Sequence, residues 1–266
     1  MTPALAAPAS EPQLGSLVAG FVLLVAGLAA LTVRRLHDPM QSPRTTRRAL
    51  LYALVYGLCS ACFARVISGA LLGREHSPWL LALGDVIFVT IGLYVWVMAL
   101  AEGHALRDYG FRRVPPRRLV ITGLMGLGAV ALYALIPYRE LFAHRVPTSP
   151  DTLVFALLFA AIGSALPDEL IFRGYLMSSL NGRMSRWARV ALPALAFTVV
   201  RSMRVTPSLG LGSPAWMFYI FGVVLPLGLW WGLMRELAGG ALWPCLASHF
   251  LLEFGITLAG AAPAFP

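Results

Sequence analysis

The sequence contains no lysine, few cysteines and few charged residues, and each shortage narrows the class of protein. Charged residues make up 12% of the 266 positions, whereas soluble domains carry roughly a quarter. Hydrophobic residues reach 58%, and the mean hydropathy is +0.74. These values exclude a soluble globular domain and indicate a polytopic membrane protein whose principal partner is the lipid bilayer.

The three cysteines argue against a structural zinc site. Cys59 and Cys62 have the spacing Cys-x-x-Cys, but no second pair of cysteine or histidine residues lies nearby to complete a tetrahedral site. Both fall in an apolar run among alanines and a serine. We therefore interpret them as small packing residues at a helix interface.

The absence of lysine means that all 21 basic residues are arginine, and their distribution is a topology signal. Fifteen lie in or next to alternate loops between the apolar runs: Arg34, Arg35, Arg44, Arg47, Arg48, Arg107, Arg112, Arg113, Arg117, Arg118, Arg173, Arg183, Arg186, Arg189 and Arg235. The other loops hold four, which are Arg74, Arg139, Arg145 and Arg204. The positive-inside rule then predicts that the arginine-rich loops face the cytoplasm and that both termini lie outside it.

The arginine distribution and the lack of lysine also bear on the expected binding partner and cellular location. A net charge of +9 would by itself suggest a nucleic acid partner, but charge that follows the loops so closely is explained by topology, and we expect no nucleic acid partner. An arginine-only composition indicates a GC-rich bacterial genome, so we expect the bacterial plasma (inner) membrane. The first apolar run has no basic segment before it and arginines after it, which favours an anchor over a cleaved signal peptide.

Apolar runs long enough to cross a bilayer set the predicted fold, because a spanning helix needs about 20 mostly apolar residues. The sequence has eight such runs, near 14–33, 49–73, 79–101, 119–137, 151–172, 190–203, 214–234 and 239–260. We predict an all-α, polytopic transmembrane bundle of about eight spans, with the fifth helix continuing to about residue 182. Gly123, Gly126 and Gly128 are predicted to be small residues at a helix interface.

The predicted organisation is one integral domain with a mobile N-terminal stretch. Residues 1–13 are rich in alanine and proline and are expected to be mobile. Pro137, Pro147 and Pro150 mark a joint between an N-terminal four-span half, 14–150, and a C-terminal half, 151–262.

Nearly all the unusual polar residues fall in the C-terminal half. Positions four apart share a helix face, and three predicted helices each carry such a pair in an apolar setting. Ionisable groups inside a membrane cost about 3 kcal/mol each even on lenient scales, so we expect the three helices to share an interior. The predicted cluster comprises Asp168, Glu169, Arg173, Arg201, His249 and Glu253.

Adjacent carboxylates in such a cluster can divide the work of hydrolysis. Arg173, one turn after Glu169, is placed to pair with it, which leaves Asp168 as a base toward water. His249 is a candidate to donate to an oxyanion or to shuttle a proton. These parts would serve hydrolysis of a peptide bond within the membrane.

The same residues carry a resemblance to a known family. The run Asp168-Glu169-Leu-Ile-Phe-Arg173 is similar to the first motif, E-E-x-x-x-R, of the CPBP intramembrane proteases, which include CAAX prenyl endopeptidases and bacteriocin-processing or self-immunity proteins. Phe197-Thr-Val-Val-Arg201 aligns with that family's F-x-x-x-H, and His249-Phe-Leu-Leu-Glu253 with its H-x-x-x-N/D. The resemblance covers roughly residues 151–260. It implies a helical membrane fold, a site within the bundle, and a glutamate that activates water.

Three departures from the motifs leave the activity open. Asp168 replaces a glutamate, Arg201 a histidine and Glu253 an Asn or Asp. Arginine cannot accept a proton or bind a metal, and with one histidine left in the cluster we expect no zinc and no other cofactor. Because the second and third changes offset each other in charge, we predict a buried ion pair between Arg201 and Glu253. A rival hypothesis makes Arg201 the oxyanion stabiliser, with Glu253 positioning it.

Two functions from different classes follow. The first is an intramembrane endopeptidase that acts on membrane-associated proteins or peptides. The second is a catalytically silent member that binds such a protein as a scaffold or immunity factor. A transporter is disfavoured because the halves show no internal repeat.

Overall fold

The computed structural model describes residues 38–71, 94–95, 97–98, 101–136 and 150–260, and all regular structure within them is helical. The predicted all-α class is therefore confirmed. The predicted spans near 14–33 and, for the most part, 79–101 lie outside the described residues, as does the predicted mobile stretch 1–13.

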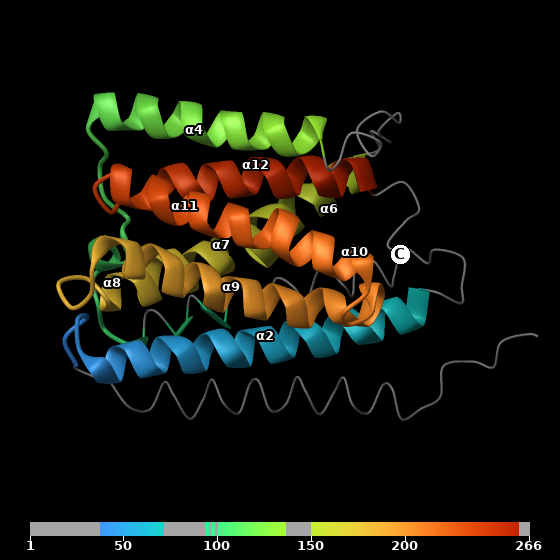
Figure 1. Ribbon diagram of the computed structural model, residues 1–266, viewed down its shortest axis with the longest axis horizontal. Helices are drawn as coiled ribbons and strands as arrows, with labels where there is room; N and C mark the ends of the chain where they lie inside the picture. Colours follow the sequence, from blue (N-terminus) through green and yellow to red (C-terminus); the bar gives the residue numbers. More distant parts are fainter. Residues whose placement is uncertain (1–37, 72–93, 96, 99–100, 137–149, 261–266) are drawn as a thin grey trace, which may run out of the picture.

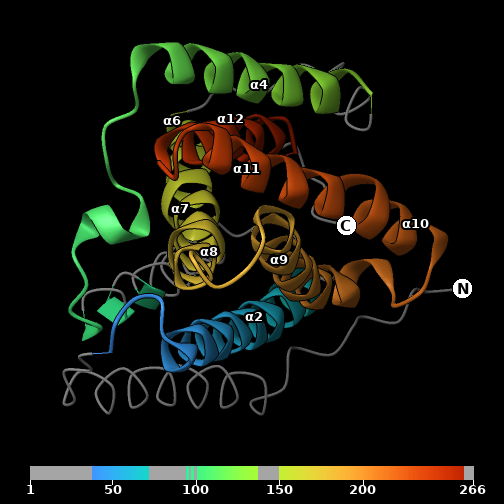
Figure 2. The same ribbon diagram turned by 60° about the vertical axis from the view of Figure 1, so that its left-hand side comes forward.

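The helices form a layered bundle (Figure 1). Helix α4 (Pro116–Leu135) lies on one outer side and packs against α12 (Trp243–Gly260) and α11 (Leu225–Leu237). Helix α2 (Pro43–Leu71) lies on the opposite side against α9 (Arg186–Leu209), which also contacts α11. Figure 2 shows the remaining helical run, 150–179, between these layers. This run carries the first motif and so places it in the interior.

The run 150–179 is a single helical path whose geometry alternates between α and π. It consists of α6 (Pro150–Leu158), η2 (Phe159–Ala165), α7 (Leu166–Asp168), η3 (Glu169–Leu176) and α8 (Met177–Ser179), where η2 and η3 are π-helical. The helix thus continues past the predicted span, close to the expected residue 182. Wide π turns are frequent at functional sites, and Asp168 and Glu169 stand at the junction between α7 and η3.

Prolines explain where two of the π segments occur. Pro167 follows η2 by two residues, and Pro226 follows η4 (Phe218–Val224), which joins α10 (Pro214–Met217) to α11. A proline has no N–H to donate and clashes with the carbonyl of residue i−4. The backbone N–H just before each proline instead bonds five residues back, from Leu166 to Ala161 and from Leu225 to Ile220. Pro193 is accommodated in α9 without such a segment.

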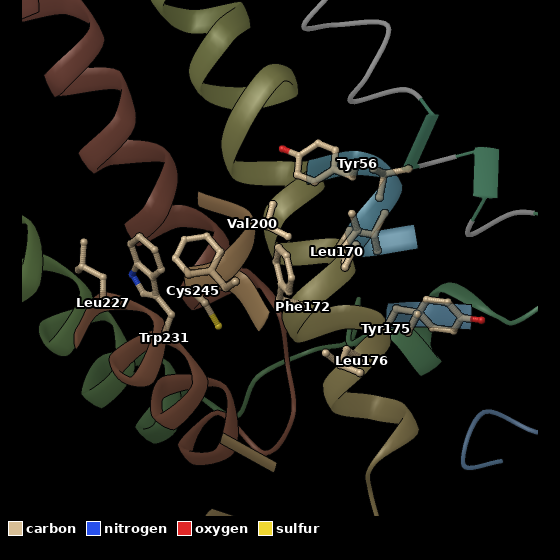
Figure 3. Close-up of a cluster of buried hydrophobic side chains, with 14 of the residues drawn as sticks. Tyr56, Leu170, Phe172, Tyr175, Leu176, Val200, Leu227, Trp231 and Cys245 are labelled. Carbon is tan, nitrogen blue, oxygen red and sulfur yellow. The ribbon is translucent and has the colours of Figure 1, made fainter. Parts of the chain in front are cut away.

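The core lies where η3 crosses between α2 and the α11–α12 pair. Figure 3 shows Phe172 of η3 between Trp231 of α11 and Leu170, with Tyr56 of α2 close to Leu170 and Tyr175 on the side away from Trp231. Large apolar side chains also cover the outside of the bundle. On α4, Leu124 is 66% and Leu135 70% exposed. Such an outer surface fits lipid rather than water.

Two helices are long and apolar enough to cross a membrane among the residues described, Pro116–Leu135 and Pro214–Leu237. They coincide with the predicted spans near 119–137 and 214–234, while the full number of eight stays a prediction. Helix α9 is longer than the predicted span 190–203, with 24 residues, and it carries four arginines. At 1.5 Å per residue its length would suffice to cross the hydrocarbon core.

The structure corrects the predicted location of two arginines. Arg173 was counted with the loop after the fifth span, and Arg204 with the loop after the sixth. Both lie on helices, with 0% and 8% of their surface exposed. They belong to the interior of the bundle, because each has polar partners there.

The remaining arginine-rich loops gather at one end of the bundle, on the left in Figure 1. We call residues 38–48, 105–118, 177–189 and 235–243 the arginine end. Hydrogen bonds tie these segments together: Leu242 N to Gly110 O (2.9 Å), Ser178 Oγ to Asp108 O (2.7 Å) and Arg183 Nη1 to Thr46 Oγ1 (2.9 Å). A Cβ at Gly110 would lie 2.7 Å from the Gly240 carbonyl oxygen, and its φ is +98°, so only glycine fits this joint.

Candidate active site

The structure brings all six predicted residues together in the interior. Asp168 ends α7, Glu169 and Arg173 lie on η3, Arg201 on α9, and His249 and Glu253 on α12. Four of them are 0% exposed, namely Asp168, Glu169, Arg173 and His249. Arg201 is 6% exposed, and the Glu253 side chain 17%. The cluster is therefore a desolvated site that is most accessible beside Glu253.

Glu169 is the fixed member of the carboxylate pair. Its Oε1 accepts a hydrogen bond from Arg173 Nη1 at 3.1 Å and lies 2.9 Å from His249 Nδ1. Arg173 Nη2 donates to the Gly228 carbonyl at 2.9 Å, and its guanidinium lies 4.5 Å from the centre of the Phe197 ring. Glu169 and Arg173 thus pin η3 to α11 and α12. The predicted pairing of the two residues is present.

Arg201 stands at the centre of the other half of the cluster. Its Nη2 lies 2.7 Å from Glu253 Oε1 and 2.7 Å from Asp168 Oδ2. The same nitrogen lies 2.8 Å from Ser164 Oγ and 3.0 Å from His249 Nε2. The predicted ion pair between Arg201 and Glu253 is confirmed, and Asp168 shares it. Two hydrogens on one nitrogen cannot serve four neighbours equally.

Asp168 is paired in charge but not in hydrogen bonds. Its contact with Arg201 is close, yet neither Oδ1 nor Oδ2 has a hydrogen-bond partner of acceptable geometry. A buried carboxylate normally accepts several hydrogen bonds. Asp168 is therefore held less firmly than Glu169, and a water molecule can reach its Oδ2 only when Arg201 Nη2 moves away.

The neighbours of His249 assign its tautomer. Nδ1 faces the Glu169 carboxylate, which accepts, and Nε2 faces Arg201 Nη2 at 3.0 Å, which can only donate, with Glu253 Oε1 further away at 3.5 Å. The shorter contacts are satisfied by a neutral ring with its proton on Nδ1. The ring stacks on Trp231 at 4.1 Å between centroids, with 19° between planes, which fixes its orientation. In this arrangement Nε2 has no proton to donate, so the predicted donor role would require Arg201 to withdraw.

Sequence reasoning missed several neighbours of the cluster. Ser164, four residues before Asp168, contacts Arg201. Arg204, three residues after Arg201, donates to Tyr56 Oη at 2.8 Å and to Ser60 Oγ at 3.4 Å on α2. The i,i+4 and i,i+3 spacings to residues already singled out were the available signal. With Arg204 included, the cluster holds three buried arginines, two buried carboxylates and the partly buried Glu253.

Among the residues that the structure describes, no group of three or more His, Cys, Asp or Glu side chains is arranged to hold a metal ion. The arginines occupy the positions between the acidic side chains of the cluster. The expectation of no cofactor stays a prediction.

Comparison with known proteins finds one matching family model. The family model of the Rce1-like type II CAAX prenyl endopeptidases matches residues 150–255. This segment runs from the start of α6 into α12 and contains all six residues of the cluster. No curated protein and no solved structure matches the chain. The matched segment, residues 150–255, thus resembles the Rce1-like type II CAAX prenyl endopeptidases, in agreement with the motifs read from the sequence.

Proposed function

We propose that this protein is an intramembrane endopeptidase that hydrolyses peptide bonds of membrane-associated proteins or peptides, with Asp168 as the base that activates water. The observation that carries the proposal is the different state of two adjacent buried carboxylates. Glu169 is held by Arg173 and His249, whereas Asp168 has only the ion pair of its Oδ2 with Arg201 Nη2 and no hydrogen bond of good geometry at either oxygen. A base toward water needs accessible lone pairs, which Asp168 gains when Arg201 Nη2 moves away from it. The family match over the same residues supports the reaction class.

The chemistry follows from these positions. A water molecule beside Asp168 gives its proton to the carboxylate as its oxygen attacks the scissile carbonyl carbon. The charge that develops on the carbonyl oxygen is met by a guanidinium N–H of Arg201, which stays tethered to Glu253. Asp168 then returns the proton to the leaving amine as the C–N bond breaks. One oxyanion donor contributes about 10²–10³-fold in rate, and a positioned base about 10²–10⁴-fold.

We place the protein across a bacterial plasma membrane in several passes, with the arginine end in the cytoplasm and both termini outside. The convergence of the arginine-rich loops at one end supports this orientation. The exposed apolar side chains of α4 and the two apolar helices support the lipid contact. The substrate would then be held in or beside the membrane.

One observation favours the second candidate, a catalytically silent protein that binds a membrane peptide. Arg201 Nη2 lies within 3.0 Å of Asp168, Glu253 and His249, and so occupies the space between the base and the histidine. Water or a substrate carbonyl would have to displace this nitrogen from Asp168. If it stays, the site binds but does not hydrolyse.

Cleavage of a fluorogenic peptide library by the full chain in proteoliposomes tests both candidates. The endopeptidase predicts cleavage that is lost in Asp168→Asn and retained in Asp38→Asn, a matched loss of a carboxylate at the arginine end. A chelator should leave the rate unchanged. If folded parent protein does not cleave but the double variant Arg201→His with Glu253→Asn does, the native chain is silent and the proposal is wrong.

A further inference from the structure

A second polar feature lies apart from the cluster, at the arginine end. It is a cavity of about 290 Å³ between η1 (Leu106–Tyr109), the end of α8, the end of α11 and the turn at 239–240. Its charged lining comprises Arg107, Asp108, Arg112, Arg189, Arg235 and Glu236. We call it the Arg235 cavity.

Arg235 is the buried cation of this cavity. It is 5% exposed, and its Nη2 donates to Ser178 Oγ at 2.7 Å, while Nε has no hydrogen-bond partner. None of the ion pairs formed within the described residues includes Arg235. Buried charges in proteins are normally paired. Arg173 and Arg201 in the interior follow that rule, since each contacts a carboxylate.

The carboxylates of the cavity wall are engaged by other groups. Glu236 Oε2 accepts from Arg189 Nη2 at 2.9 Å. Asp108 Oδ2 accepts the backbone N–H of Ala105 at 3.1 Å. Neither forms an ion pair with Arg235 within the described residues. Four arginines against two carboxylates leave the lining with a net positive charge.

We propose that the Arg235 cavity binds an oxyanion, a carboxylate or phosphate group carried by a water-soluble ligand, with Arg235 as its main ligand. A guanidinium presents a planar fork of N–H donors that matches both groups. The apolar lining is confined to Met40 and Met177, which gives a lipid acyl chain nothing to lie against. The site is independent of peptide hydrolysis, because none of the six cluster residues lines the cavity.

Oxyanion binding is measured on the full chain in detergent micelles, by titration calorimetry and by the unfolding temperature at constant ionic strength. Inorganic phosphate is the first probe. A short peptide with a free C-terminal carboxylate, compared with its C-terminal amide, is the second. Phosphate should raise the unfolding temperature of the parent and of Arg47→Gln, an exposed arginine at the same end but outside the cavity. Binding should weaken at least tenfold in Arg235→Gln.

Arg235→Gln should also fold at least as well as the parent without added anion, because it removes an unpaired buried charge. Should it fail to fold, Arg235→Lys keeps the charge and must weaken binding while the protein remains folded. Tighter binding of the acid peptide than of its amide identifies a peptide terminus, and equal binding with a phosphate response identifies a free ion. Absence of any response to phosphate and to the acid peptide in the parent, or equal responses in parent and Arg235→Gln, overturns the site.

Discussion

At the scale of single residues, Arg201 determines how the cluster is held. Because an arginine stands where the family motif has a histidine, the sequence predicted an ion pair with Glu253. The structure shows that Asp168 contacts the same nitrogen, Nη2, of Arg201. Arg201 therefore serves two carboxylates, while Glu253 has Arg201 at 2.7 Å and His249 only at 3.5 Å. Removal of the arginine and removal of the glutamate should not have equal effects.

A double-mutant cycle measures this asymmetry. Arg201→Ala leaves Asp168 and Glu253 without their cation and should lower the free energy of unfolding by about 3–5 kcal/mol. Glu253→Ala should cost less, because Arg201 keeps Asp168 and the Glu253 side chain is 17% exposed. The double variant should cost less than the sum. Chemical unfolding in mixed micelles gives the energies, and strict additivity would show that the two residues do not interact.

The protonation of His249 is a second prediction at this scale. The neutral tautomer with its proton on Nδ1 follows from the donors and acceptors around the ring. Nitrogen NMR of histidine-labelled protein should show an Nε2 that accepts a hydrogen bond, with the signal assigned by its loss in His249→Gln. In Arg201→Met the Nε2 acceptor bond should disappear. A proton on Nε2 in the parent would contradict the assignment and restore the donor role expected from the sequence.

At the scale of elements, one glycine sets how closely α4 approaches α12. A Cβ at Gly126 would lie 3.0 Å from Ser248 Cβ and 3.2 Å from Met234 Cε. At Gly123 and Gly128 an added Cβ would meet none of the described residues within 4 Å. The prediction that all three glycines lie at a helix interface is therefore correct for Gly126 and wrong for the other two, because only one of these positions faces the bundle.

Alanine substitutions separate the three positions. Gly126→Ala should destabilise the protein by about 1–3 kcal/mol, the usual cost of overpacking. Gly123→Ala and Gly128→Ala should be neutral or stabilising by up to ~1 kcal/mol, because alanine favours the helix. The unfolding temperature of the three variants in one detergent gives the comparison. Equal destabilisation by all three would mean that α4 packs on more than one face.

Spacing in the sequence anticipated much of the site but not its details. The pairs Glu169–Arg173 and His249–Glu253 share helix faces, and their apolar surroundings required a common interior, so the cluster was predictable. The contacts of Ser164 and Arg204 were not, because each depends on where a neighbouring helix passes. The π segments also escape a search for α periodicity. They alter the register around Pro167, and with it the direction in which Asp168 and Glu169 point.

At the scale of the whole molecule, the described residues gather arginine at one end of the bundle. The segments of the arginine end come from loops far apart in the sequence, yet they are joined by hydrogen bonds and by the ion pair of Arg189 with Glu236 at 2.9 Å. At the opposite end, α9 and α10 are connected by the turn around Gly210 and Gly212. From this distribution the positive-inside rule predicts an orientation in which the arginine end faces the cytoplasm.

The absence of lysine makes this orientation directly measurable. A single introduced lysine is the chain's first side-chain amine, so a membrane-impermeant amine reagent applied to intact cells reports on one position at a time, with the parent as the control for the N-terminal amine. Arg113→Lys and Arg47→Lys, both exposed at the arginine end, should be labelled only after the cells are opened. Leu211→Lys, at a position 75% exposed at the other end, should be labelled in intact cells. The reverse pattern would invert the orientation and put the Arg235 cavity outside the cell, and labelling of all three in intact cells would contradict a membrane-spanning arrangement.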